Sequence, residues 1–334
     1  MNTATTILSE IQKAQTTKPV NKEIIKNPAS GKKNEFLFIL KPEVFARINT
    51  HQIESILKLI LDRLAEHNFS MDNVRIINAA YLDQFNVIAQ HYGVINAAAR
   101  DFNSQITEEI TSAFKSIYNR ELTDSKVVGS LETAEKYPQI TDEILQKLWS
   151  SCEIKRLAGG VYCGEVDFEN DKLYIINGFH PPQIRHFIAE NRMILTMNLS
   201  GDIDWKSARQ EFIGNTYPEK AAKGSLRRDI FDKYGKLGFD DVSYVINSLH
   251  LSAGPLEALL ELQRFNSEFQ HDVECPISEF GFGKLLEANF SKSDCDKITG
   301  NPTVNFQGKQ VSLFDLTEEL NTEETLALIK TTMD

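Results

Sequence analysis

Apolar residues along the chain follow two spacings, one typical of strands and one typical of amphipathic helices. A continuous apolar run at 36–40 has the length of a strand that is covered on both faces. The helical spacing i, i+3, i+4, i+7 then appears between Ile53 and Leu64. The same patterns predict further strands at 74–79, 173–176, 193–198 and 242–247, and further helices at 85–92, 182–189 and 256–265. This alternation predicts an α/β protein, and it fits either helices on a small antiparallel sheet or a doubly wound sheet.

The two ends and the middle of the chain break the alternation. Residues 1–33 are polar and end in Pro-Ala-Ser-Gly-Lys-Lys, which predicts a mostly disordered segment with a short helix at 7–13. Residues from about 96 to 171 carry separate helical stretches and a glycine-rich turn, and we interpret them as a mostly helical insertion. Residues 266–334 form a C-terminal extension, with a hairpin predicted at 304–313 and helices after it.

Composition narrows the classes of partner. The chain has 334 residues, of which 41% are hydrophobic, as expected of a globular protein with a sizeable core. A net charge of -11 argues against a broad phosphate-tracking surface, so we expect no nucleic acid partner. No apolar run is long enough for a membrane span and no signal-peptide core is visible, which predicts a cytoplasmic location without a membrane partner. The four cysteines lack any Cys-x-x-Cys spacing, which argues against a zinc site.

A histidine and a glutamate provide the first candidate chemistry. His250 follows an apolar strand pattern, and Glu261 comes eleven residues later on an amphipathic helix. Three turns of helix can bring the carboxylate back beside the imidazole, where it would fix the tautomer of the ring. A histidine nucleophile needs this arrangement, because only a neutral imidazole with an available lone pair attacks. A lone histidine in such a place is more often structural, so the neighbouring segments decide between a structural and a catalytic role.

Three upstream segments carry groups suited to a polyphosphate. Lys41 stands at the end of the 36–40 strand. Thr216 lies in a Gly-Asn-Thr-Tyr-Pro turn, and Arg227 lies in a Gly-Ser-Leu-Arg-Arg-Asp turn. The cations neutralise phosphate charge, the hydroxyl and backbone N–H groups donate hydrogen bonds, and the glycines allow close approach.

Taken together, these segments resemble the nucleoside diphosphate kinase family. Its pattern is a strand with Ile-Lys-Pro, a Gly-x-Thr-x-Pro turn, a Gly-Thr-Ile-Arg-Gly-Asp turn, and Asn-x-x-His-Gly-Ser-Asp-Ser with a downstream Glu. Spacing within 214–227 and within 247–261 matches that pattern without a gap, and His-Tyr at 91–92 matches the pair that ends the second helix of the family. The resemblance covers roughly residues 35–95 and 173–265.

The resemblance implies both a fold and an activity. The fold would be a ferredoxin-like α/β sandwich with a four-stranded antiparallel sheet at 34–265, interrupted by the insertion and by a lengthened loop at about 230–241. ATP or another nucleoside triphosphate would phosphorylate the histidine, and a nucleoside diphosphate would remove the phosphoryl group. Mg²⁺ would be held mainly through the nucleotide phosphates, so no residues dedicated to binding a metal are expected.

Residue roles carry over from the family motifs. His250 would accept the phosphoryl group, Glu261 would bond to its other ring nitrogen, and Lys41 would act with them in catalysis. The residues implied to bind the nucleotide are Tyr92, Arg209, Thr216, Arg227 and Asn247. The family's base-stacking aromatic has no clean match, and Phe179 is the substitute we assign.

The sequence also departs from the family pattern. Leu251 and Ala253 replace the glycine and aspartate after the histidine, and we expect the leucine to crowd the nucleophile. Gln210 occupies the place of a family arginine, with Arg209 one position out of register. Two alternatives therefore remain: an enzyme that hydrolyses nucleotide or transfers a nucleotidyl or phosphoryl group elsewhere, and a non-catalytic nucleotide-binding module. Homo-oligomer formation and a protein partner for the insertion or the C-terminal extension are left open.

Overall fold

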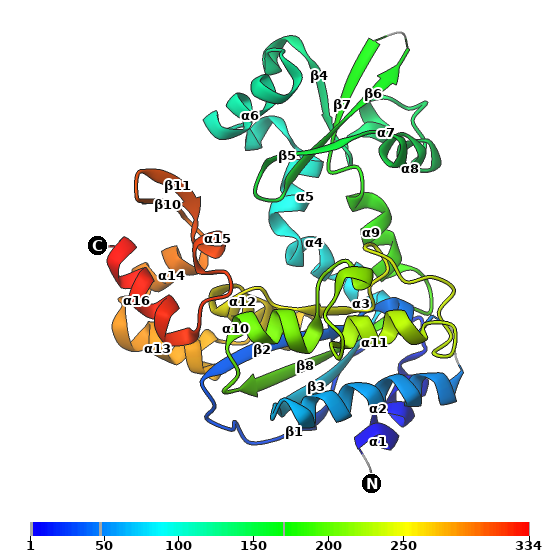
Figure 1. Cartoon of the computed structure of the whole chain (residues 1–334), viewed down its shortest axis with the longest axis vertical. Coiled ribbons are helices and arrows are strands. Elements are labelled where there is room, and N and C mark those ends of the chain that lie inside the picture. The colour runs from blue at the N-terminus through cyan, green and yellow to red at the C-terminus, as the bar shows by residue number, and fades with distance from the viewer. Residues whose placement is uncertain (1–2, 47–48, 170, 334) are drawn as a thin grey trace. The chain divides into compact units, whose positions relative to one another are not determined.

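The structure is a computed structural model that describes residues 3–46, 49–169 and 171–333 (Figure 1). The chain divides into two compact units, one formed by Met1–Val87 with Phe187–Asp334 and the other by Ile88–His186. None of the described helices combines the length and the apolar character that crossing a membrane requires.

The first unit is built on an antiparallel sheet of five strands in the order β1-β3-β8-β2-β9. The strands are β1 (Asn21–Lys26), β2 (Asn34–Leu40), β3 (Ser70–Asn78), β8 (Met193–Gly201) and β9 (Leu249–Leu251). The prediction of an α/β protein with an antiparallel sheet is confirmed, but the predicted count of four strands is wrong. An extra edge strand, β1, pairs with β3 through the register Asn21↔Ile77.

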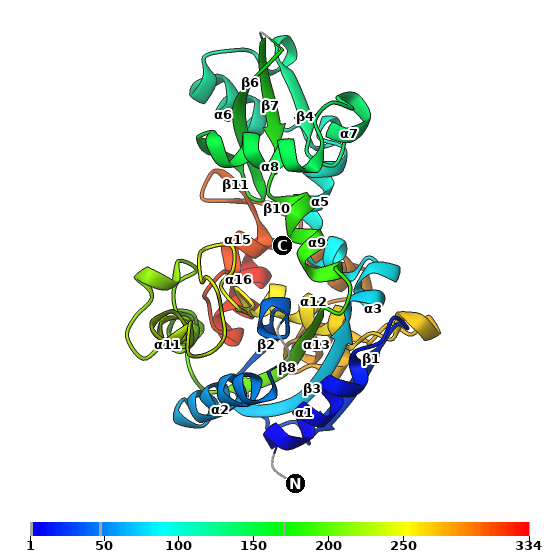
Figure 2. The same cartoon turned by 90° about the vertical axis from the view of Figure 1, so that its right-hand side faces the viewer.

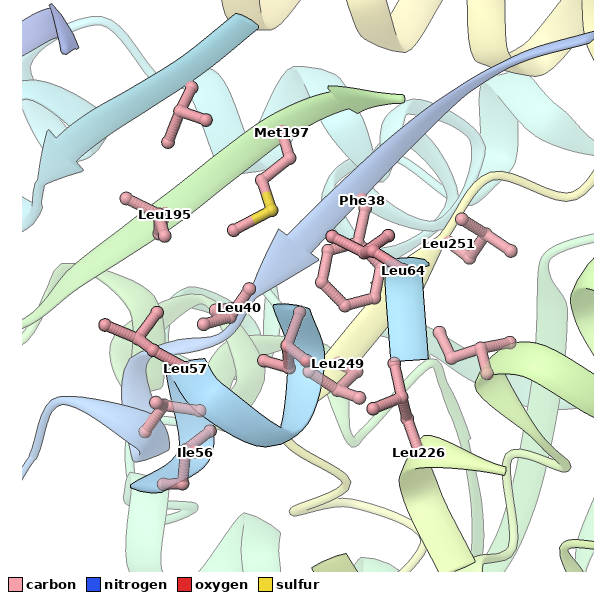
Figure 3. Packing of buried hydrophobic residues seen from close by; sticks show 14 of the residues in the cluster. Phe38, Leu40, Ile56, Leu57, Leu64, Leu195, Met197, Leu226, Leu249 and Leu251 are labelled. Atoms are coloured by element: carbon pink, nitrogen blue, oxygen red, sulfur yellow. The ribbon is translucent and has the colours of Figure 1, made fainter. Parts of the chain in front are cut away.

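Helices cover both faces of this sheet (Figures 1 and 2). On one face, α2 (Thr50–Glu66) buries Ile56, Leu57 and Leu64 against alternate residues of β2 (Figure 3). Its N-cap is Asn49, whose side chain accepts a hydrogen bond from the His51 amide. On the other face lies α12 (Pro255–Asn266), which packs on β2. The strand at 36–40 is apolar throughout because both of its faces are covered.

The N-terminal segment is ordered where it is described, so the prediction that 1–33 is disordered is wrong. The helix α1 (Thr3–Ala14) buries Ala4, Ile7 and Ile11 in the same core as α2. These positions follow the helical spacing i, i+3, i+7. The polar residues between them dominate the composition, which is why the segment looks disordered from composition alone. The short helix predicted at 7–13 lies within α1 and is confirmed.

Shorter elements connect these strands and form the C-terminal extension. The hairpin predicted at 304–313 is confirmed as β10 and β11, which are followed by two helices. The elements are α3 (Ala79–Gln84), α10 (Trp205–Ser207), a π-helix (Ala208–Ile213), α11 (Leu226–Lys233), α13 (Gly281–Asn289), α14 (Lys292–Thr299), β10 (Thr303–Phe306), β11 (Lys309–Ser312), α15 (Leu313–Thr317) and α16 (Thr322–Met333). The predicted strand at 242–247 is wrong, because that stretch is loop and the strand begins at Leu249.

The second unit contains a four-stranded sheet besides its helices, and the description of 96–171 as mostly helical did not include this sheet. Its strands run in the order β4-β7-β6-β5, with β4 parallel to β7 and the other pairs antiparallel. The unit is also wider than the predicted insertion, since the predicted strand at 173–176 belongs to its sheet. Its elements are α5 (Gly93–Arg100), α6 (Glu108–Tyr118), β4 (Lys126–Gly129), α7 (Thr133–Lys136), α8 (Asp142–Ser151), β5 (Ile154–Ala158), β6 (Val161–Phe168) and β7 (Asp171–Ile176). Two helices, α4 (Val87–His91) and α9 (His180–Ile188), cross its boundaries.

Candidate active site

The strand β9 presents His250 and buries the residues on either side of it. Leu249 and Leu251 point into the core of the first unit beside Phe38 and Leu226 (Figure 3). Because successive side chains of a strand alternate between faces, His250 lies on the other face, which α12 covers. The expectation that Leu251 crowds the nucleophile is therefore wrong.

His250 and Glu261 are in contact. The imidazole Nε2 and the Glu261 Oε1 are 2.9 Å apart, and the side chains are 21% and 3% exposed. The second carboxylate oxygen, Oε2, accepts a hydrogen bond of 2.5 Å from the Ser252 hydroxyl. A carboxylate accepts and does not donate, so the proton of a neutral ring is assigned to Nε2 and the lone pair to Nδ1. Nδ1 is therefore the atom that can attack an electrophile.

Ser252 matches the serine of the family motif but was assigned no role from the sequence, although it completes this chain of hydrogen bonds. It is fully buried, and its Oγ also accepts a hydrogen bond of 3.0 Å from the Leu37 amide on β2. The period-2 spacing of a strand places residues 250 and 252 on one face, and that is the signal that could have found it. Ser252 thus attaches the Glu261 carboxylate to the sheet.

Lys41 and Asn247 meet at the end of β2. The Lys41 ammonium donates to the Asn247 Oδ1 at 2.6 Å, and the Lys41 amide donates to the Ser248 carbonyl at 2.9 Å. The Asn247 amide group donates to the carbonyls of Tyr244, at 3.1 Å, and Thr216, at 3.5 Å. A buried asparagine therefore joins the lysine to two loops that are distant in the sequence.

The environment of Lys41 makes it an unusual cation. Burial lowers the pKa of its ammonium group to about 8, while Glu43 raises that pKa and Arg227 lowers it further. Near neutral pH the group is still largely protonated, and it loses its charge in mildly basic solution. An anion bound beside it would favour the charged form.

Glu43 is a second residue that the sequence did not single out. Its Oε1 accepts a hydrogen bond of 2.7 Å from the Ser248 amide. Ser248 has a φ of 65°, a left-handed conformation that is unfavourable for a residue other than glycine. Glu43 thus helps to hold the reversal of the chain that leads into β9.

Arg227 lies at the start of α11, behind β9. Its guanidinium donates to the carbonyls of Gly214, at 2.8 Å, and Leu249, at 2.9 Å. Gly214 has a φ of 88°, and a Cβ there would collide with the Ser225 side chain, so the turn requires glycine. The arginine expected to hold phosphate therefore directs two of its donors to backbone carbonyls and fixes the strand that carries His250.

Arg209 makes different contacts from those expected. On the π-helix, its Nη1 lies 3.2 Å from Glu318 Oε1 and its Nε lies 3.4 Å from Glu319 Oε1. Both carboxylates come from the C-terminal extension. The guanidinium that was expected to bind phosphate is thus paired with protein carboxylates.

Thr216 lies on an exposed turn beside a pair of tyrosines. The rings of Tyr217 and Tyr244 are stacked, with centroids 4.7 Å apart and an interplanar angle of 23°. Both rings are exposed, and the Lys220 Nζ lies 4.4 Å from the centre of the Tyr217 ring. Neither tyrosine was singled out from the sequence, where their positions next to Thr216 and three before Asn247 were the available signal.

Tyr92 and Phe179 belong to the second unit. Tyr92 precedes α5, and its ring centre lies 4.6 Å from that of His91. The ring of Phe179 packs near Trp149 and Tyr162, at centroid distances of 6.0 Å and 5.9 Å. Phe179 therefore contributes to the packing of its own unit.

Comparisons with known proteins give little information about the function of this chain. No protein-family model and no curated protein matches the sequence. A solved structure that does match is described as the crystal structure of nucleoside diphosphate kinase from Encephalitozoon cuniculi, apo. It is 14% identical, covers 70% of this chain and 90% of that chain, and has a TM-score of 0.35. A match with a TM-score this low does not support a function for this chain.

Proposed function

We propose that this protein is a nucleoside diphosphate kinase-like phosphotransferase that works through a phosphohistidine at His250. The lone pair of Nδ1 would attack the γ-phosphorus of a nucleoside triphosphate. A bond would form between Nδ1 and phosphorus, the bond from the γ-phosphorus to the β–γ bridging oxygen would break, and the diphosphate would leave with those electrons. A second nucleoside diphosphate would then take the phosphoryl group from the ring, which restores the neutral imidazole.

The observation that carries this proposal is the hydrogen-bonded series Ser252–Glu261–His250. Attack by Nδ1 leaves positive charge on the ring, with the proton retained on Nε2. The buried Glu261 carboxylate lies 2.9 Å from that nitrogen, where it would stabilise the charge without reorganisation. A structural histidine does not require a buried carboxylate with its second oxygen anchored to the sheet.

The polyphosphate would lie beside Lys41. Its ammonium group, the amide of Asn247 and the exposed turn that contains Thr216 meet at the end of β2. Charge and hydrogen-bond donors in one place are what a phosphoryl group needs, since its transfer depends on positioning and charge stabilisation. Arg227 would contribute by fixing β9 and by adding positive charge near Lys41.

The nucleobase would stack on Tyr217 and Tyr244. Their backbones are joined to the phosphate-binding groups through Asn247 and Thr216, and their rings are exposed. A base that stacks on an aromatic ring gains about 1–3 kcal/mol. This assignment replaces Phe179, which packs against Trp149 and Tyr162.

The residues of the first unit fit a Mg²⁺ ion that is held through phosphates. The carboxylates of Glu43 and Glu261 already accept hydrogen bonds, from Ser248 and from His250 and Ser252. Lys41 and Asn247 would instead bind the phosphates that coordinate the ion. Held there through the nucleotide, Mg²⁺ would supply positive charge that offsets part of the phosphate charge.

A labelling experiment tests the proposal. Wild-type protein, His250→Asn and His271→Asn are incubated with γ-labelled ATP and Mg²⁺, then chased with unlabelled nucleoside diphosphates. His271 is an exposed histidine of the same unit and provides the matched control. We expect an acid-labile label on the wild type and on His271→Asn that the chase removes, and no label on His250→Asn. Label that persists in His250→Asn would contradict the proposal.

One observation favours a second function. Arg209 and Arg227 already contact protein groups, which suits a protein that binds nucleotide without exchanging phosphoryl groups. Such a non-catalytic module would bind ATP in calorimetry but acquire no label in the experiment above.

A further inference from the structure

Residues 317–321, which are the last residue of α15 and the four residues before α16, lie against the turn that follows β9, and we call them the acidic strap. The Glu319 amide donates a hydrogen bond of 2.9 Å to the carbonyl of Ala253, three residues after His250. A Cβ at Gly254 would lie 2.7 Å from the Thr317 carbonyl oxygen, so this close approach depends on glycine. A change in the strap would therefore be transmitted directly to the turn after the proposed nucleophile.

The far end of the strap is attached through the side-chain amide of Asn321. The Asn321 Oδ1 accepts hydrogen bonds from the Trp205 amide, at 3.1 Å, and from the Asn34 side chain, at 3.0 Å. The Asn321 Nδ2 donates to Asp204 at 2.9 Å. These bonds do not involve Glu318 or Glu319, so neutralising the two carboxylates leaves this attachment in place.

Both charged side chains of the strap are engaged with Arg209. Glu318 and Glu319 lie 3.2 Å and 3.4 Å from the guanidinium. The two carboxylates are 45% and 32% exposed, so water and salt reach these ion pairs. Exposed pairs of this kind are weak, and a stronger anion can replace them at low cost.

Acidic groups of α12 surround the same arginine. Burial and the neighbouring Glu261 raise the pKa of Glu257 to about 8, while Arg209 lowers it and Glu318 raises it. The other cation of this group is Arg264, which faces Glu257 and Glu261 from the same helix. If Arg209 turned to another anion, Glu318 would be left facing the acids of α12. The two carboxylates of the strap thus depend on Arg209 for their counter-charge.

We propose that the acidic strap is an internal anion that occupies Arg209 until the polyphosphate of a nucleotide displaces it. This inference rests on the proposed function, and it adds Arg209, which the family resemblance implies in nucleotide binding, to the groups that would hold the polyphosphate. A nucleoside triphosphate carries more charge than two carboxylates, and a guanidinium binds phosphate oxygens in a bidentate manner. The strap lowers the apparent affinity for nucleotide in proportion to the time that it occupies the arginine.

The test compares two double variants with the same change in charge. E318Q/E319Q neutralises the strap, and E287Q/E323Q neutralises two exposed carboxylates elsewhere in the C-terminal extension. Calorimetry measures Kd for ATP with Mg²⁺ and for inorganic tripolyphosphate. We expect E318Q/E319Q to bind both roughly threefold or more tightly than the wild type, as two weak ion pairs would allow. E287Q/E323Q is expected to bind like the wild type.

Arg209→Gln provides the second arm of the test. In the wild-type background it should weaken binding, and in the E318Q/E319Q background it should abolish the gain, because the strap then has no arginine to vacate. The single variants E318Q and E319Q should each give part of the gain. Unchanged or weaker binding by E318Q/E319Q overturns the inference, as does an equal gain in E287Q/E323Q or a gain that survives Arg209→Gln.

Failure of the inference and failure of the proposed function give different results. If E318Q/E319Q binds nucleotide more tightly but His250 acquires no label, the inference about the strap is supported and phosphotransfer through His250 is contradicted. If His250 is labelled but nucleotide affinity is the same in E318Q/E319Q as in the wild type, only the inference about the strap is contradicted. Absence of nucleotide binding in every variant overturns the inference, whereas binding that appears only in E318Q/E319Q supports it.

Discussion

The proton of His250 is placed by two side chains behind it, and each can be tested singly. Glu261 holds Nε2, and Ser252 holds the other oxygen of Glu261. Without Ser252 the carboxylate would lose its attachment to β2. The role of Ser252 is therefore to position Glu261, and its removal should affect the transfer step more than the fold.

Ser252→Ala should slow phosphorylation of His250 by roughly tenfold or more, since a hydrogen bond to a charged group contributes about 1.5–3 kcal/mol. The measurement is the rate at which label from γ-labelled ATP appears on the protein. Ser150→Ala removes an exposed serine of the second unit and should leave the rate unchanged. Equal rates for Ser252→Ala and wild type would show that Ser252 does not position Glu261.

Lys41 predicts a pH dependence of nucleotide binding. Burial lowers the pKa of Lys41 to about 8, and only the protonated amine attracts phosphate. Affinity should therefore be highest below pH 8 and decline as the pH rises above it, until the pKa of the nucleotide-bound form is reached. Lys41→Arg stays charged throughout this range, so its affinity should not show this decline. A wild-type affinity that is constant from pH 7 to 9.5 would contradict the assignment.

Some site contacts were accessible from the sequence, and others were not. The approach of Glu261 to His250 follows from eleven residues of local helix and turn geometry. The partners of Arg209 and Arg227 could not be anticipated, because Glu318, Glu319 and the carbonyl of Leu249 reach them only through tertiary folding. Motif spacing predicts which residues are present near a site, but not which protein groups already bind them.

At the level of elements, α1 shows how composition can hide a helix. Its apolar residues are few, but they lie on one stripe and are buried. The strand β9 shows the opposite error, since the apolar residues before Asn247 suggested a strand at 242–247. The left-handed Ser248, with a φ of 65°, reverses the chain, and the strand begins only after it.

Ile7→Ala tests whether α1 belongs to the core. Ile7 is completely buried, and truncation of a buried isoleucine costs about 2–5 kcal/mol of the free energy of unfolding. Denaturant unfolding should show this loss for Ile7→Ala and almost none for the exposed Thr5→Ala. If residues 1–33 were disordered, as their composition suggested, neither substitution would change the stability.

At the scale of the whole molecule, the pattern of apolar and polar residues predicted the fold class and the order of the main strands and helices. It missed the sheet of the second unit, whose strands are short and pair with partners that hydrophobic periodicity does not reveal. The net charge of -11 also conceals a local arrangement. Arg227 and Lys41 donate hydrogen bonds to the carbonyls of the two residues before His250, while acidic groups gather around Arg209. A phosphate site can therefore exist in an acidic protein.

The most direct test of the central claim is ³¹P NMR of the intact protein after phosphorylation with ATP and Mg²⁺, combined with mass spectrometry of its peptides. Because Glu261 holds Nε2, we predict a single phosphohistidine, at His250, with phosphorus on Nδ1. Phosphorus on Nε2 would contradict the role of Glu261. Phosphorus on another residue, or no phosphoenzyme in a protein that binds ATP, would contradict phosphotransfer through His250.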